Sequence, residues 1–231
     1  MQTEFRAKGV VWDFDGTLMD SFGLYKSGVT DALTRLGMSI PADEVFVHNY
    51  HGRLRDSIQA VCGVHGALLE EIYEVFVRSE ERHYKHPDNL YFADAINLLH
   101  RTHAVGVLQI IISNRAHQGD DYLGSPRNLA QRSPLAGCIE SVVCGDDNQE
   151  FHKPDARVLD STELQLGLRR SDLLVVGDQF VDAELARNLG CRAVIIARNS
   201  EQMPHLDRLA DGWQEHVTIV RSLAEVAILP A

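Results

Sequence analysis

The stretch that decides the fold runs from Gly9 to Ser21 and reads GVVWDFDGTLMDS. It begins as an apolar run typical of a buried strand and then places Asp13 and Asp15 two residues apart, directly before Gly16. In an ideal strand, residues 13 and 15 point to the same face. Two such carboxylates repel each other and need a cation or a shared proton, and glycine allows a sharp turn after them. A bare pair of this kind is often only an acidic turn that caps the next helix, so the rest of the chain must decide.

After residue 90 the chain alternates between short runs rich in β-branched residues and amphipathic stretches. Strands are expected at 9–15, 105–112, 139–144, 173–176 and 193–197, and helices at 93–103, 126–133, 154–166 and 182–189. This alternation predicts an α/β fold with a parallel sheet and right-handed crossovers. The tail is expected to add a short strand at 217–220 and a last helix.

Residues 20–90 carry helical periodicity only. One apolar stripe begins at Tyr25 and ends before Gly37, and a second runs from Leu68 to Phe76. The stretch is too long for a simple crossover between parallel strands, so it predicts a separate all-helical module. The expected domains are therefore a core of residues 1–19 and 91–231 and an inserted helical domain of residues 20–90.

Polar residues follow the predicted strands at the edge where open parallel sheets bind ligands. Asp13 and Asp15 follow the first strand, and Ser113-Asn114 follows the second. Lys153 lies in the loop after the third, and Asp178 follows the fourth. Carboxylates, a hydroxyl, an amide and an ammonium are thus expected to meet in one crevice.

These residues form four motifs in a characteristic order. They are Asp13-Phe14-Asp15-Gly16-Thr17, Ser113-Asn114, Lys153-Pro154 and Gly177-Asp178-Gln179-Phe180-Val181-Asp182. The set resembles the haloacid dehalogenase-like superfamily, over about residues 10–197. The resemblance implies a Rossmann-like core with a parallel sheet of five to six strands, and it implies that the helical insert is a cap that closes over the site.

The resemblance also implies a role for each motif residue. Asp13 would be the nucleophile that forms an aspartyl-phosphate, and Asp15 the general acid and base. Lys153 and Ser113 would hold the nucleophile and the phosphoryl oxygens, and Gly16, Thr17 and Asn114 would bind substrate. Mg²⁺ would be bound by Asp13, the Asp15 backbone carbonyl and Asp178, supported by Asp182. For Asp182, a structural role as the N-cap of the next helix is an equal alternative.

Within the insert, Arg53 lies where related caps carry a specificity loop, so it is a candidate to grip an anionic group of the substrate. A surface arginine at a helix start is the competing interpretation. Two departures from the family pattern stand out: the segment 115–137 is long, and His152 replaces the small residue common before the motif lysine.

The composition is that of a globular protein with 45% hydrophobic residues and a net charge of −11. The acidic balance argues against nucleic acid or an anionic membrane as partner. The four cysteines show no metal-ligand spacing, and no apolar run of membrane-spanning length occurs, so a cytoplasmic location is expected.

We therefore expect a Mg²⁺-dependent phosphatase that acts on a small phosphorylated metabolite, as a monomer or homodimer. A phosphomutase of the β-phosphoglucomutase type is the nearest alternative, since it uses the same motifs. A non-catalytic binding protein on the same fold would be expected to have lost a motif residue, and all are present.

Overall fold

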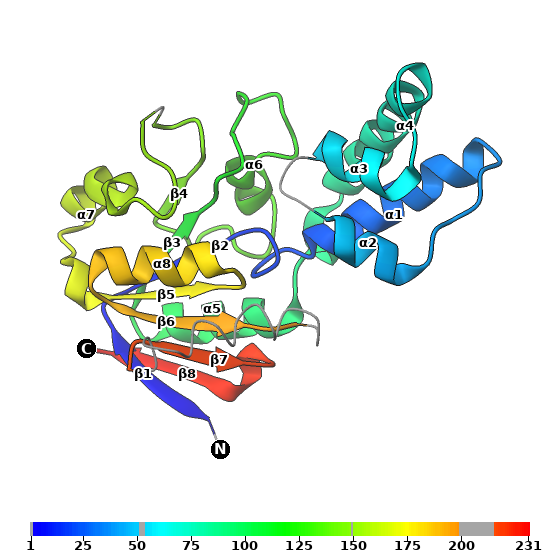
Figure 1. The fold of residues 1–231 in the computed structure, drawn as a ribbon. Helices are drawn as coiled ribbons and strands as arrows, with labels where there is room; N and C mark the ends of the chain where they lie inside the picture. The colour runs from blue at the N-terminus through cyan, green and yellow to red at the C-terminus, as the bar shows by residue number, and fades with distance from the viewer. Residues whose placement is uncertain (1, 51–53, 149, 199–214) are drawn as a thin grey trace. The chain divides into compact units, whose positions relative to one another are not determined.

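The computed structural model describes residues 2–50, 54–148, 150–198 and 215–231 (Figure 1). The chain divides into two compact units, one made of residues 1–19 and 91–231 and the other of residues 20–90. Within the described ranges, no helix combines the length and the apolar character needed to cross a membrane.

The larger unit is built on a six-stranded sheet in which every neighbouring pair is parallel, as the sequence predicts. Its strand order is β4-β3-β2-β5-β6-β7. The strands, in chain order, are β2 (Gly9–Asp13), β3 (Leu108–Ile112), β4 (Ser141–Val143), β5 (Leu173–Gly177), β6 (Arg192–Ile196) and β7 (Val217–Val220). All five residues of the central strands β2 and β5 are buried, which explains their nearly continuous apolar sequences.

Helices pack on the sheet through alternate strand residues. Val11, Val175 and Ile195 share one apolar cluster with side chains of α8 (Phe180–Leu189). The helix α5 (Ala93–Ala104) leads from the insert to β3, α6 (Pro126–Gln131) lies between β3 and β4, and α7 (Asp160–Leu166) lies between β4 and β5 (Figure 1). The connections after β2 and β5 lead to neighbours on opposite sides, so these two strands flank the switch point of the sheet, where α/β folds bind ligands.

The smaller unit contains only helices among its described residues: α1 (Ser21–Arg35), α2 (Asp43–Asn49), α3 (Leu54–Cys62), α4 (Ala67–Tyr84) and a 3₁₀ turn at Pro87–Leu90. Its core gathers apolar residues from all four α-helices, with Tyr25, Phe46 and Phe76 in ring contact. Gly28 lies where α1 and α4 meet, and a Cβ there would come within 2.8 Å of the Phe76 ring. This core explains how the smaller unit packs through helices alone, without a strand of its own.

The structure corrects the sequence prediction in two places. The tail ends in β8 (Val226–Pro230), which pairs in parallel with β1 (Thr3–Ala7) as a separate two-stranded sheet, and between β7 and β8 the chain forms only a 3₁₀ turn (Leu223–Glu225). Neither strand was predicted from the sequence. The helix expected in the tail is not present as an α-helix among residues 215–231, and residues 199–214 lie outside the described part of the chain. The helix expected from Pro154 begins later, as a 3₁₀ turn (Ala156–Leu159) capped by Asp155 and continued by α7, because the Asp155 carboxylate accepts from the Arg157 N–H.

Candidate active site

The buried Lys153 connects the first motif with the fourth. Nζ of Lys153 donates to Oδ1 of Asp13 and, at 2.8 Å, to Oδ1 of Asp182. The side chains of Lys153, Asp13 and Asp182 are only 4%, 7% and 1% exposed. β2 carries Asp13 and α8 carries Asp182, so the lysine ties the central strand to the helix after β5.

Asp182 performs the capping role that the sequence left open, although not as the N-cap residue itself. The helix α8 begins at Phe180 with Gln179 as N-cap, and Asp182 is the third helical residue in a capping box. Its Oδ2 accepts from the N–H groups of Asp178 at 3.2 Å and Gln179 at 3.1 Å. A Cβ at residue 177 would lie 2.4 Å from Asp182, so Gly177 is needed for this close approach.

Three buried carboxylates concentrate negative charge at the end of β2 and β5. One oxygen from each of Asp13, Asp178 and Asp182 lies within 4.8 Å of the others. Burial, together with the charge of Asp182, raises the pKa of Asp13 to about 7, against the opposing effect of Lys153. Burial and the charges of Asp13 and Asp182 also raise the pKa of Asp178 well above its ordinary value.

The same charges act on the lysine in the opposite sense. Burial alone would lower the pKa of Lys153, but the neighbouring carboxylates of Asp13 and Asp182 outweigh it and raise that pKa above its ordinary value. The ammonium form of Lys153 is therefore favoured despite its burial. One buried cation faces three buried carboxyl groups, so a second cation bound here would offset negative charge that Lys153 leaves unbalanced.

The turn after β2 is fixed by contacts that reach Asp13. Thr17 is fully buried, and its Oγ1 donates to Oδ2 of Asp13 at 3.2 Å. Gly16 has a φ of +83°, and a Cβ there would lie 2.3 Å from Oδ2 of Asp178. These two residues were predicted to bind substrate. In the structure, Thr17 orients Asp13 and Gly16 leaves space for Asp178.

Asp15 lies beside the end of β3 and has a partner that the sequence analysis missed. Oγ of Ser113 lies 3.3 Å from Oδ2 of Asp15, and the Arg115 guanidinium forms an ion pair with Oδ1. Arg115 also donates to the carbonyl oxygen of Gly124 at 3.0 Å. Its position directly after the Ser113-Asn114 motif was the available signal, because a residue that follows a strand end reaches the same edge of the sheet.

Asn114 is engaged by the backbone of the lysine loop. Its Oδ1 accepts from the Lys153 N–H at 3.0 Å, and its Nδ2 lies 3.4 Å from the Lys153 carbonyl oxygen. The side chain therefore aligns the loop that carries Lys153, and the predicted role of Asn114 in substrate binding stays a prediction.

The long segment after Arg115 is held by its own polar contacts. Nδ1 of His117 lies 2.9 Å from Oγ of Ser125, and Nε2 lies 3.1 Å from Oδ1 of Asp120. Although these three residue types also occur in hydrolase triads, Ser125 is fully buried and its hydroxyl caps α6 by accepting from the Asn128 N–H at 3.0 Å. The group therefore stabilises the loop.

Arg53 lies outside the described residues. Its neighbour in the same stretch, Arg55, pairs with Glu70 at 2.5 Å and stacks 4.3 Å from the centre of the Tyr73 ring. These contacts lie within the helical unit. For Arg55 they agree with a role as a surface arginine near a helix start.

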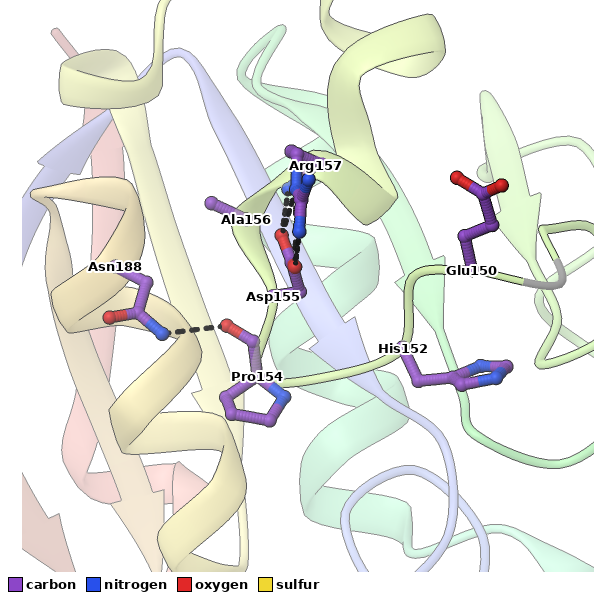
Figure 2. Close-up of a pocket in the computed structure, with 7 residues that line it drawn as sticks. All are labelled: Glu150, His152, Pro154, Asp155, Ala156, Arg157 and Asn188. Atoms are coloured by element: carbon purple, nitrogen blue, oxygen red, sulfur yellow. Dashed lines mark hydrogen bonds and ion pairs between the residues drawn. The ribbon is translucent and has the colours of Figure 1, made fainter.

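A cavity of about 600 Å³ lies beside the lysine loop (Figure 2). It is lined by Glu150, His152, Pro154, Asp155, Ala156, Arg157 and Asn188. Two interactions join residues of its lining: the Asp155–Arg157 ion pair and the hydrogen bond that Asn188 donates to the Pro154 carbonyl oxygen at 2.9 Å (dashed in Figure 2). His152 thus lines this cavity, which includes none of the clustered carboxylates.

The carboxylate cluster fits a magnesium ion. Hard divalent cations prefer oxygen ligands, and Asp13 and Asp178 supply buried carboxylate oxygens close to one another. The raised pKa values of both groups show that the site disfavours their negative charges when no second cation is near. Asp182 already uses Oδ1 for Lys153 and Oδ2 for the α8 N-terminus, so it fits a supporting role.

Comparison with known proteins agrees with the motifs. The sequence pattern of the haloacid dehalogenase-like hydrolases matches residues 10–196. The chain is 26% identical, over 91% of its length and 93% of the relative, to a phosphoglycolate phosphatase of Rhodobacter capsulatus. The chain belongs to the haloacid dehalogenase-like hydrolase family.

Solved structures share the fold at low sequence identity. A predicted phosphoglycolate phosphatase from Haemophilus somnus has a TM-score of 0.72 and 15% identity, with 96% of each chain covered. A protein assigned as a beta-phosphoglucomutase from Thermotoga maritima has a TM-score of 0.70 and 14% identity, covering 94% of this chain and 95% of that one. Both likenesses concern the fold alone.

Proposed function

We propose that the chain is a Mg²⁺-dependent phosphatase that hydrolyses a small phosphomonoester through an aspartyl-phosphate on Asp13. The observation that carries this proposal is the buried group of Asp13, Asp178 and Asp182 around Lys153. A cluster of this kind is costly for stability alone, and it lies at the switch point of the sheet, where α/β folds bind ligands.

In this mechanism Asp13 attacks phosphorus, and Thr17 and Lys153 hold its carboxylate in the attacking orientation. Bound Mg²⁺, held by Asp13, Asp178 and the Asp15 carbonyl oxygen, would neutralise the charge on the phosphoryl oxygens. Lys153 and the Ser113 hydroxyl supply further positive charge and a hydrogen-bond donor to the charge-rich transition state.

In its protonated form Asp15 gives a proton to the leaving oxygen as Asp13 bonds to phosphorus, and the resulting carboxylate then takes a proton from the water that attacks the aspartyl-phosphate and releases phosphate from Asp13. The ion pair with Arg115 holds its carboxylate beside Ser113 when no substrate is present. The helical unit, as a cap, would exclude water during the first step and carry residues that select the substrate, with Arg53 as a candidate.

The substrate class is small phosphorylated metabolites, and phosphoglycolate is the first one to test because the Rhodobacter capsulatus relative bears that name. The test is a set of phosphorylated metabolites incubated with Mg²⁺, scored separately for phosphate release and for phosphate transfer to a second position. Release supports the phosphatase. Transfer without net release would replace it with a phosphomutase, and neither reaction on any compound would contradict both.

A further inference from the structure

Arg198 follows β6 and donates to three groups that belong to two other segments. Its Nε donates to the carbonyl oxygen of Gly16 at 3.0 Å, and its Nη2 donates to that of Thr17 at 2.8 Å. Its Nη1 pairs with Oδ1 of Asp94 at 3.1 Å. The planar guanidinium therefore bridges the turn at the end of the first motif and the start of α5.

The arginine is itself held in place. Its guanidinium carbon lies 3.4 Å from the centre of the Phe92 ring, and its side chain is 18% exposed. The other oxygen of Asp94 accepts from the Ser222 hydroxyl at 3.1 Å and from the Leu223 N–H at 2.9 Å. Burial opposes the charge of Asp94, but the Leu223 hydrogen bond and Arg198 outweigh it, and the pKa of Asp94 lies below its ordinary value.

The turn that Arg198 binds is also the turn that orients the first aspartate. Thr17 donates to Asp13 through its side chain while its carbonyl oxygen accepts from Arg198. Gly16 packs against Asp178 while its carbonyl oxygen accepts from the same guanidinium. A shift of this turn by a fraction of an ångström would therefore move the carboxylate of Asp13.

We propose that Arg198 is a positioning residue for the reaction: it holds the Gly16–Thr17 turn against the start of α5 and so keeps Asp13 oriented for attack. This inference rests on the proposed phosphatase function. None of the four motifs includes Arg198, and the hydrogen bonds described above reach the first motif through the backbone carbonyls of Gly16 and Thr17 rather than through motif side chains.

The test compares Arg198→Lys with Arg192→Lys. Lysine keeps the charge but has a single donor atom, which cannot span two carbonyls and a carboxylate. Arg192 is the matched control, because it is the first residue of β6, the strand that Arg198 follows, and its guanidinium carbon lies 4.7 Å from the centre of the Phe5 ring. We expect Arg198→Lys to lower kcat on an active phosphoester by about tenfold or more with little change in KM, since a displacement near 1 Å can cost about a hundredfold.

Two further readouts separate positioning from general stability. The first is a double-mutant cycle with Thr17→Val, which removes the contact from the turn to Asp13. The two changes should be non-additive in kcat if Arg198 acts through this turn. The second is the backbone amide resonance of Gly16 in protein labelled with ¹⁵N-glycine, which should shift or broaden in Arg198→Lys and stay unchanged in Arg192→Lys. If Arg198→Lys does not fold, Asp94→Asn is the milder change, because it weakens the ion pair that holds Arg198 but keeps the arginine itself.

An unchanged Gly16 resonance in Arg198→Lys, or a kcat equal to that of Arg192→Lys, would overturn the inference. Additive effects in the cycle would overturn it as well. The proposed function fails by a different result, namely turnover that survives in Asp13→Asn.

Discussion

The Lys153 ammonium donates a 2.8 Å hydrogen bond to Asp182 in a part of the core where both side chains are less than 5% exposed. The same ammonium contacts Asp13, so one cation separates two buried anions. A buried cluster of charges is rarely the most stabilising arrangement, because hydrophobic side chains of similar volume often stabilise a fold as well or better. Its arrangement is better explained by chemistry at Asp13.

Replacing Lys153 with methionine should damage both activity and folding. The change leaves Asp13 and Asp182 buried with no lysine between them, and removing one partner of a buried ion pair typically costs about 3–5 kcal/mol. We expect a large fall in the melting temperature and loss of turnover. Chemical denaturation and steady-state kinetics measure the two effects, and a variant with wild-type stability would show that the lysine is solvated in solution.

Asp178→Asn should weaken the response to metal without unfolding the protein. The amide keeps the shape of the side chain but removes a negative charge from the cluster. The Mg²⁺ concentration for half-maximal activity should rise by at least about tenfold, the lower end of the effect seen even for residues that only support metal ligands. Asp160→Asn is the control, since Asp160 is 56% exposed and pairs with Arg170 at the surface. An equal response in both variants would remove Asp178 from the metal site.

The raised pKa of Asp13 predicts how stability depends on pH in protein treated with a chelator. The folded state binds the Asp13 proton up to about pH 7, whereas an unfolded chain releases it near 3.8. The stabilisation from Asp13 is therefore fully present below about pH 4 and is lost as the pH rises through about 7, and Asp178 acts in the same direction.

Melting temperatures measured between about pH 4 and 7 test whether stability falls as the pH rises. As the pH rises from about 4 to 7, the melting temperature of the wild type should fall relative to that of Asp13→Asn. Mg²⁺ should diminish this trend because it favours the ionised carboxylates. Taking the difference between variants cancels the titration of the histidines. A difference that does not change with pH would contradict the buried, proton-binding environment of Asp13.

Asp15→Ala should separate substrates by their leaving group. General acid catalysis typically supplies about 10²–10⁴-fold, and an alkoxide needs the proton far more than a nitrophenolate does. Single-turnover rates of phosphoryl transfer should fall much further on phosphoglycolate than on p-nitrophenyl phosphate. Equal losses on both would mean that Asp15 serves metal geometry or folding instead.

The central strands of the sheet could be predicted from sequence because they are buried on both faces. Runs such as Leu173–Val176 are almost wholly apolar, and the polar motif residues stand where those runs end. The strands β1 and β8 escaped prediction because their pairing joins the two ends of the chain. Five residues with alternating burial at Thr3–Ala7 carry little local signal, and pairing over that separation depends on the completed fold.

The site was predictable as a set of residue types but not as a set of contacts. The motifs name Asp13, Lys153 and Asp182, and the resemblance implied that Lys153 holds Asp13, but only the fold shows that the lysine also binds Asp182. Arg198 has no sequence signal at all, because its partners on the turn are backbone carbonyls and every residue type supplies one of those.

The most direct test of the account is to trap the phosphorylated enzyme. In the proposed mechanism Asp15 is the base that activates water, so Asp15→Ala should accumulate an aspartyl-phosphate when mixed with p-nitrophenyl phosphate and Mg²⁺. Mass spectrometry after rapid quenching should find one phosphoryl group on the peptide that contains Asp13, and Asp13→Asn in the same background should carry none. A phosphoryl group on another residue, or p-nitrophenol released with no labelled enzyme at any time, would contradict Asp13 as the nucleophile.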